Sequence, residues 1–170
     1  MKPFSHTTHA IHVVAQEKND LTSWVGHRKA DHQDMVTGQT FIAPQEGDLE
    51  AIEVYSAVVS DPGRVTLKLH VFDAETGRWG PMVCASSVEF DRHLNNKWVS
   101  FDLPPFHLRE GDSYGFMLES ENSFIGVGEA IGCADAPPYR NGREWKGKSH
   151  SETGEFFNYF SLAFKVDIRA

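Results

Sequence analysis

The chain has 170 residues, of which 24 are acidic and 16 basic, so its formal charge is −8 and its pI is about 5.5. Hydrophobic residues make up 40% and charged residues 24%, which is usual for a folded soluble domain and excludes wholesale disorder. The length fits one domain with a substantial core. The acidic balance argues against nucleic acid and anionic membrane surfaces as partners, because both select clustered Lys and Arg.

Residues 1–36 are polar, and their one apolar patch, Ala10 to Ala15, fits a single strand. No apolar stretch of about 7–15 residues follows Lys2, so no secretory signal peptide is predicted. The compartment stays open between the cytoplasm and a mature, exported form. No apolar run approaches the roughly 18–20 residues of a spanning helix, so we expect no integral membrane association.

From Thr37 onward, short runs alternate between apolar and polar residues, and Gly, Pro, Asn and Asp separate them. The clearest run is Arg64 to Asp73, where Val65, Leu67, Leu69 and Val71 are expected on one face and Thr66, Lys68 and His70 on the other. The strongest alternation closes the chain, with Phe160, Leu162, Phe164, Val166 and Ile168. The whole pattern predicts an all-β fold, an antiparallel sandwich of about eight or nine strands.

One segment interrupts this rhythm. Residues 128–155 are rich in Gly, Pro, Asn and charged side chains, which predicts a long loop in a sandwich that spans residues 37–170. Loops of about 28 residues are uncommon in compact domains and are usually functional or disordered. This segment is therefore the first place to look for a binding site.

Several motifs resemble a jelly-roll domain that is common in exported bacterial proteins. They are Gln39-Thr40-Phe41-Ile42-Ala43-Pro44, Gly47-x-Leu49-x-x-Ile52-x-Val54, Trp98-Val99-x-Phe101, Leu108-x-x-Gly111-x-x-Tyr114-x-Phe116, Tyr139-x-x-Gly142-x-x-Trp145 and Leu162-Ala163-Phe164. The resemblance covers residues 37–168 and implies a fold similar to carbohydrate-binding modules and galactose-binding-like sandwiches. It also implies an exported or cell-surface location and a non-catalytic accessory or adhesion role.

The long loop carries the first candidate site, formed by Tyr139, Arg140, Asn141, Glu144 and Trp145. Sugars are bound by aromatic faces that stack on C–H patches and by planar polar groups that pair with hydroxyls. These five residues supply both kinds of group. The alternative is that Trp145 folds back over the end of the sandwich as a hydrophobic plug.

The second candidate is an outward sheet face that carries Trp98 and His70, which would suit an oligosaccharide groove if the two lie together. The alternative places Trp98 over a sheet edge or under a loop.

Two groups of residues are candidates for binding a metal ion. Five of the nine histidines lie in the first 32 residues, namely His6, His9, His12, His27 and His32. The first three would converge only on a helix, which the β-branched, Thr-containing sequence does not favour, and His27-x4-His32 lacks the Glu of an HExxH motif. No metal ligand is therefore assigned. A structural calcium ion is the remaining cofactor alternative, with oxygen donors at Asp73, Glu75, Asp112, Glu119, Glu121 and Asp167. A solvated acidic surface explains the same residues.

No nucleophile elbow, phosphate-binding loop or CxxC is present, so no catalytic residue is assigned. Cys84 and Cys133 are interpreted as structural thiols, with a disulfide as the alternative. The sequence thus favours a non-catalytic binding module, most plausibly for carbohydrate. A structural or adhesion domain that meets a protein partner is the second hypothesis, and a metal-dependent cupin-like enzyme is the third.

Overall fold

The computed structural model describes residues 10–30, 32–148 and 153–169. These residues form a short 3-10 helix, Arg92–Leu94, and fourteen strands: β1 (Ala10–Gln16), β2 (Leu21–Arg28), β3 (Gln33–Ile42), β4 (Gly47–Asp61), β5 (Gly63–Asp73), β6 (Arg78–Phe90), β7 (Lys97–Asp102), β8 (His107–Leu108), β9 (Ser113–Glu119), β10 (Phe124–Ile131), β11 (Glu144–Lys148), β12 (Gly154–Phe157), β13 (Phe160–Leu162) and β14 (Phe164–Arg169). The all-β prediction is confirmed, although the strands outnumber the eight or nine expected. None of the helical structure in these ranges is long and apolar enough to cross a bilayer.

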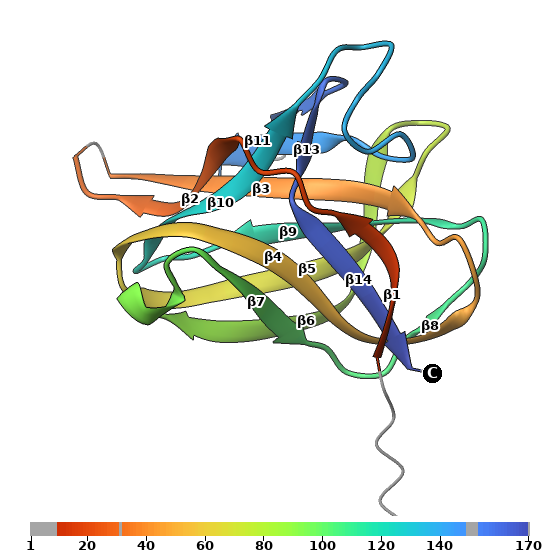
Figure 1. The fold of residues 1–170 in the computed structure, drawn as a ribbon, viewed down its shortest axis with the longest axis horizontal. Helices are drawn as coiled ribbons and strands as arrows, with labels where there is room; N and C mark the ends of the chain where they lie inside the picture. The colour runs from red at the N-terminus through yellow and green to blue at the C-terminus, as the bar shows by residue number, and fades with distance from the viewer. Residues whose placement is uncertain (1–9, 31, 149–152, 170) are drawn as a thin grey trace, which may run out of the picture.

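Every strand pairing is antiparallel, and the hydrogen-bonded order is β1-β14-β4-β10-β2-β3-β9-β5-β6. In Figure 1, β1, β14, β4 and β7 lie in front of β3, β9, β5 and β6. The long strand β4 connects the front strands to the rest of the sheet, because its first half pairs with β14 and its second half with β10. The jelly-roll topology stays a prediction.

The core fills the space between the two layers. On the front layer, alternate residues such as Ile52, Val54 and Phe101 are fully buried, and on the back layer Leu67 and Leu69 are buried with them. Aromatic rings contact each other across the gap, for example Phe116 of β9 and Phe164 of β14, whose centroids lie 5.7 Å apart. Period-2 alternation therefore predicted the inward face of these strands correctly.

One residue on the predicted inward face of the clearest run is not covered by the core. Val71 is 37% exposed, whereas Phe72 is buried. The pairing of β5 with β6 shifts register between Leu69 and His70 and again between His70 and Phe72. The faces nevertheless keep alternating, because His70 and Phe72 both contact the ring of Trp79 on the outer side of the sheet. The aromatic cluster there buries Phe72, whereas Val71, near the end of the strand, is not covered by the core.

Two regions contain more regular structure than the sequence predicts. Where one strand was expected before residue 37, the described residues contain β1, β2 and the start of β3. The expected loop 128–155 includes the end of β10, all of β11 and the start of β12. In β11 and β12, a Cβ atom at Gly147 or Gly154 would lie only 2.2 or 2.1 Å from the indole of Trp145. Glycine is therefore needed at both positions beneath the ring. Because glycine stands where an apolar side chain would mark a strand, the sequence shows no apolar alternation here.

The two cysteines do not form a disulfide. Cys84 is half-buried and Cys133 is exposed, and both thiols are free.

Candidate functional site

A cleft of about 310 Å³ opens at the end of β3, beside the segment that joins β10 to β11. That segment projects beyond the sandwich at the top of Figure 1. Polar groups reach the cleft from Thr40, Ser113, Arg140, Asn141, Arg143 and Asn158, and apolar groups from Phe41, Ile42, Phe72, Ala74, Ala134 and Pro137. The arrangement combines hydrogen-bonding groups with an apolar floor, as small-molecule sites do.

The end of β3 holds the cleft's polar wall in place. The backbone N–H of Thr40 donates to the carbonyl of Arg143 at 2.9 Å, and the N–H of Arg143 donates to Oγ1 of Thr40 at 2.9 Å. Between them, a Cβ atom on Gly142 would lie 1.8 Å from the carbonyl oxygen of Thr40. Glycine is therefore required for this close approach, which fixes the backbone that carries Arg140 and Asn141.

Tyr139 anchors the same segment from below. Its ring meets Phe164 edge-on at 5.3 Å, and its hydroxyl accepts a hydrogen bond from the N–H of Ile42 at 3.4 Å. Its own N–H donates to Oγ of Ser161 at 3.1 Å. Burial raises the pKa of the Tyr139 hydroxyl. The ring packs against the core, while Arg140 and Asn141 beside it are exposed.

Glu144 and Trp145, the other predicted residues of this loop, lie on opposite faces of β11. Trp145 is only 5% exposed and packs edge-on against Trp79 at 5.8 Å, in an aromatic cluster with Phe72 and Phe156. It therefore packs on the outer side of the sheet as a buried apolar side chain, which is closer to the hydrophobic plug than to an exposed sugar-stacking ring. Of the five predicted loop residues, Arg140 and Asn141 line the cleft.

Glu144 is fully buried on the core-facing side, next to a second buried carboxylate, Glu129 of β10. Burial, followed by the contact with Glu129, raises the pKa of Glu144 to about 10. Nζ of Lys146 lies 3.0 Å from Oε2 of Glu129 and 3.8 Å from Oε2 of Glu144. The same ammonium lies over the rings of Phe157 and Phe160. This group of ionisable residues is separate from the cleft lining.

The structure does not bring Trp98 and His70 together. His70 belongs to β5 of the back layer, where its Nδ1 lies 3.0 Å from the carbonyl of Gly80 and its ring meets Trp79 edge-on. Trp98 belongs to β7 of the front layer, between Tyr55 and Nζ of Lys165, which lies 4.2 Å from the ring centroid. Both residues alternate with core residues and so face outward from opposite layers. A single groove lined by both does not form.

The candidate calcium donors are also dispersed. Oδ1 of Asp73 accepts the N–H groups of Glu75 and Thr76, which lowers the pKa of Asp73 and closes a turn. Glu119 pairs with Lys68, and Asp167 pairs with His12. Among the histidines, His27 pairs with Asp34, whereas His6 and His9 lie outside the described residues.

Sequence reasoning missed four polar residues of the cleft, Thr40, Ser113, Arg143 and Asn158. Arg143 lies within the predicted loop, and its guanidinium sits 4.7 Å above the ring of Phe156. Asn158 lies in the short connection between β12 and β13, and only the packing of that connection beside the cleft reveals it. Arg143 follows the predicted Arg140 and Asn141 closely in the sequence, and this proximity could have identified it. No local pattern marks Asn158.

No family model and no curated protein matches the sequence. One solved structure to which the chain is similar is that of a CocE/NonD family hydrolase from Staphylococcus aureus, with a TM-score of 0.36 and 6% identity. The match covers 99% of this chain and 43% of that one, so the chain spans less than half the length of the hydrolase.

Proposed function

We propose that the protein is a non-catalytic module that binds carbohydrate in the cleft at the end of β3. The observation that carries the proposal is the convergence of Arg140, Asn141 and Arg143 on a cleft with an apolar floor. Guanidinium and amide groups pair with vicinal hydroxyls, and an apolar floor contacts the C–H face of a sugar. Because the binding groups stand on a backbone held by β3, the cleft is largely formed before the ligand arrives.

Binding to a glycan array, followed by calorimetry with the best sugar, tests this proposal. Arg140→Ala and Asn141→Ala are each expected to weaken binding by at least about tenfold, since a hydrogen bond to a charged or planar group is lost. Both side chains are exposed, so their removal leaves the core intact. Trp145→Ala is a poorer probe because it also removes a buried ring.

Arg92→Ala is the matched control. Arg92 is an exposed arginine at the opposite end of the β5–β6 hairpin, where its Nη2 donates to the carbonyl of Ser60. It is expected to bind sugar as the parent does. The proposal fails if no glycan binds the parent, or if the two cleft variants bind as tightly as the control.

Docking of a protein partner is the second candidate function, and exposed apolar side chains favour it. Ile131 is 49% exposed and Tyr159 is 39% exposed, and the N–H of Gly132 donates to the carbonyl of Tyr159, so the two lie at the same end of the molecule. Under this candidate, an Ile131→Ser/Tyr159→Ser double variant loses the partner, whereas Arg140→Ala keeps it. Pull-down with a defined partner would separate the two functions.

A further inference from the structure

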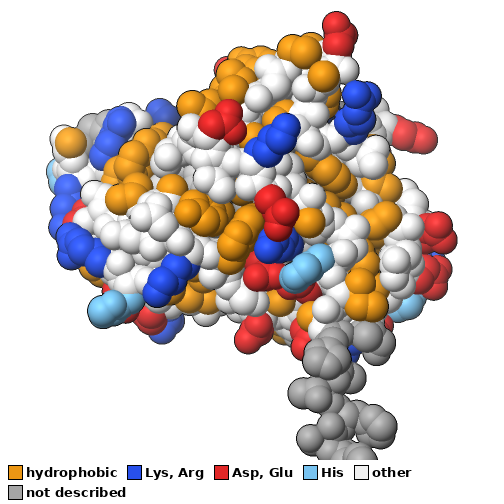
Figure 2. Space-filling view, viewed as in Figure 1, with side chains coloured by type: hydrophobic (Ala, Val, Ile, Leu, Met, Phe, Trp, Pro, Cys, Tyr) orange, Lys and Arg blue, Asp and Glu red, His pale blue; other side chains and the backbone are white. Residues whose placement is uncertain are grey.

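Three ionisable side chains from distant parts of the sequence converge on the outer face of the front layer. His12 of β1 lies opposite Asp167 of β14, and Glu53 of β4 lies on the neighbouring strand. Val166, Ile168, Ile52 and Val54, which flank the two acids, point into the core, so both carboxylates point outward. In Figure 2 the centre of this face shows acidic and basic side chains gathered with a histidine.

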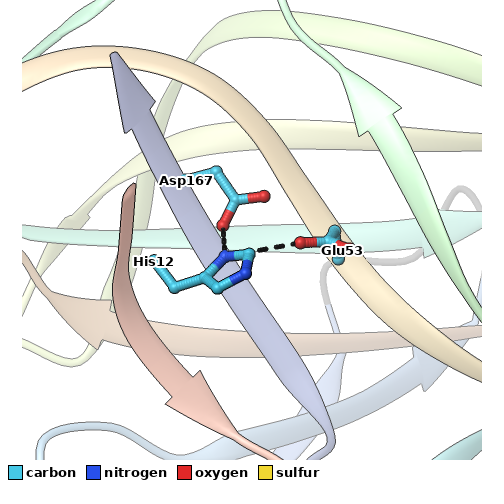
Figure 3. A group of neighbouring side chains, drawn as sticks. All are labelled: His12, Glu53 and Asp167. Carbon is cyan, nitrogen blue, oxygen red and sulfur yellow. Dashed lines mark hydrogen bonds and ion pairs between the residues drawn. The ribbon is translucent and has the colours of Figure 1, made fainter. Parts of the chain in front are cut away.

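The donor atoms of the three side chains face one another (Figure 3). Nδ1 of His12 contacts Oδ1 of Asp167 directly and lies 3.6 Å from Oε2 of Glu53. One donor atom from each residue lies within 4.8 Å of the other two. Both acids thus aim at the same ring nitrogen, and three hydrogen-bonded strands hold the group in place.

The surroundings of Glu53 and Asp167 disfavour two neighbouring negative charges without a cation between them. Asp167 is only 4% exposed although it faces outward, and Glu53 is also largely covered. The ammonium of Lys165 is engaged nearby, 3.4 Å from Oε1 of Glu17 and above the ring of Trp98. A second cation beside the carboxylates would relieve their repulsion.

The geometry points to a binding site for a divalent transition-metal ion, with Nδ1 of His12 and carboxylate oxygens of Glu53 and Asp167 as ligands. An imidazole nitrogen with two carboxylates suits zinc and its neighbours, whereas calcium and magnesium prefer oxygen ligands throughout. Zinc holds such ligands at about 2.0–2.2 Å, so side-chain adjustments of about 1 Å would bring all three donors onto one ion. Three protein ligands leave a coordination position for water on the exposed side, where His12 is half open to solvent.

Calorimetric titration of the untagged, chelator-treated protein with zinc chloride tests the inference. The parent is expected to bind one zinc ion per chain and to melt at a higher temperature with zinc than without it. His12→Ala, Glu53→Gln and Asp167→Asn are each expected to weaken binding by at least about tenfold, since each removes a ligand. His12 is half exposed, so its variant folds even if a change at the buried Asp167 does not.

His107→Ala is the matched control, because His107 also lies between two carboxylates. Its Nδ1 faces Asp48 at 3.1 Å and its Nε2 faces Glu46 at 3.2 Å, so the acids use different ring nitrogens and do not share a point. A His6→Ala/His9→Ala variant controls for the other histidines near the start of the chain. Both controls are expected to keep the zinc affinity of the parent. The inference is overturned if the parent binds no stoichiometric zinc, or if His12→Ala binds it as tightly as the controls do.

Discussion

Two carboxylate pairs in this protein lie in contrasting environments, Glu53 with Asp167 on the outer face of the front layer and Glu129 with Glu144 on the core-facing side of β10 and β11. In each pair, burial and the neighbouring acid raise the pKa of one member, Glu53 to about 7 and Glu144 to about 10. The side chain beside the outer pair is a half-exposed histidine, His12, and the side chain beside the inner pair is the ammonium of Lys146.

The difference between the pairs shows how the same repulsion is relieved at different depths. Two close carboxylates share a hydrogen bond only when one carries a proton. Away from water, Glu144 holds that proton across the physiological range, so the inner pair is a neutral acid beside an ion pair. Near the surface, Glu53 releases its proton near neutrality, and an ion from solution has access to the cluster. The inner pair is thus suited to a structural role and the outer pair to binding.

The largest effect is expected from Lys146→Met. This change leaves Glu129 without its cation inside the protein, and the free energy of unfolding should fall by about 2 kcal/mol, less than for a fully buried ion pair because Lys146 is 37% exposed. Urea denaturation at pH 7 measures it. Lys148→Met, on the same strand but exposed, should change stability by no more than about 0.5 kcal/mol. Equal stability of the two variants would show that the inner pair does not depend on Lys146.

The second prediction concerns the proton on Glu144. Because its folded pKa is raised from 4.5 to about 10, its contribution to stability is complete below about pH 4.5 and is lost progressively up to about pH 10. Glu144→Gln imitates the protonated form and cannot titrate. The variant should therefore gain stability relative to the parent as the pH rises, as measured by urea denaturation at pH 5, 7 and 9. Parallel pH profiles for the two proteins would contradict a proton held by Glu144.

Glu53 should show the same behaviour over a narrower range. Its raised pKa places the loss of stability between about pH 4.5 and 7, with no further change from this group above pH 7. Glu53→Gln, compared with the parent in the presence of a chelator, should remove that part of the pH dependence and leave the slope above pH 7 unaltered. A difference that continued to grow up to pH 9 would mean that the outer pair holds its proton as firmly as the inner pair.

Strands with one apolar face were the predictable part of this fold. Alternation identified β5 through Leu69 and the closing residues of β13 and β14, because burial against a core repeats every second residue. It missed strands in which glycine replaces the apolar partner. Gly147 and Gly154 lie beneath the ring of Trp145, so at these two positions the strands contribute no apolar side chain of their own.

The residues of the candidate sites also differ in whether local sequence could predict them. Arg140 and Asn141 were found from the composition of one loop, and the structure places both on the cleft. Glu144 and Trp145 come from the same loop, but a strand carries them to opposite faces and buries both. His12 and Asp167 were considered separately from the sequence, each as a member of a dispersed set. The pairing of β1 with β14, near the two ends of the chain, brings them together.

The sequence by itself determined that this protein is an antiparallel all-β domain, since alternation and turn residues are local properties that each segment carries within itself. It also pointed to the segment that walls the cleft. Only the tertiary structure decided which strands lie side by side, and therefore which charges meet. Strand pairing depends on the packing of the whole core. Residues 155 positions apart, such as His12 and Asp167, share no local pattern from which their contact could be predicted.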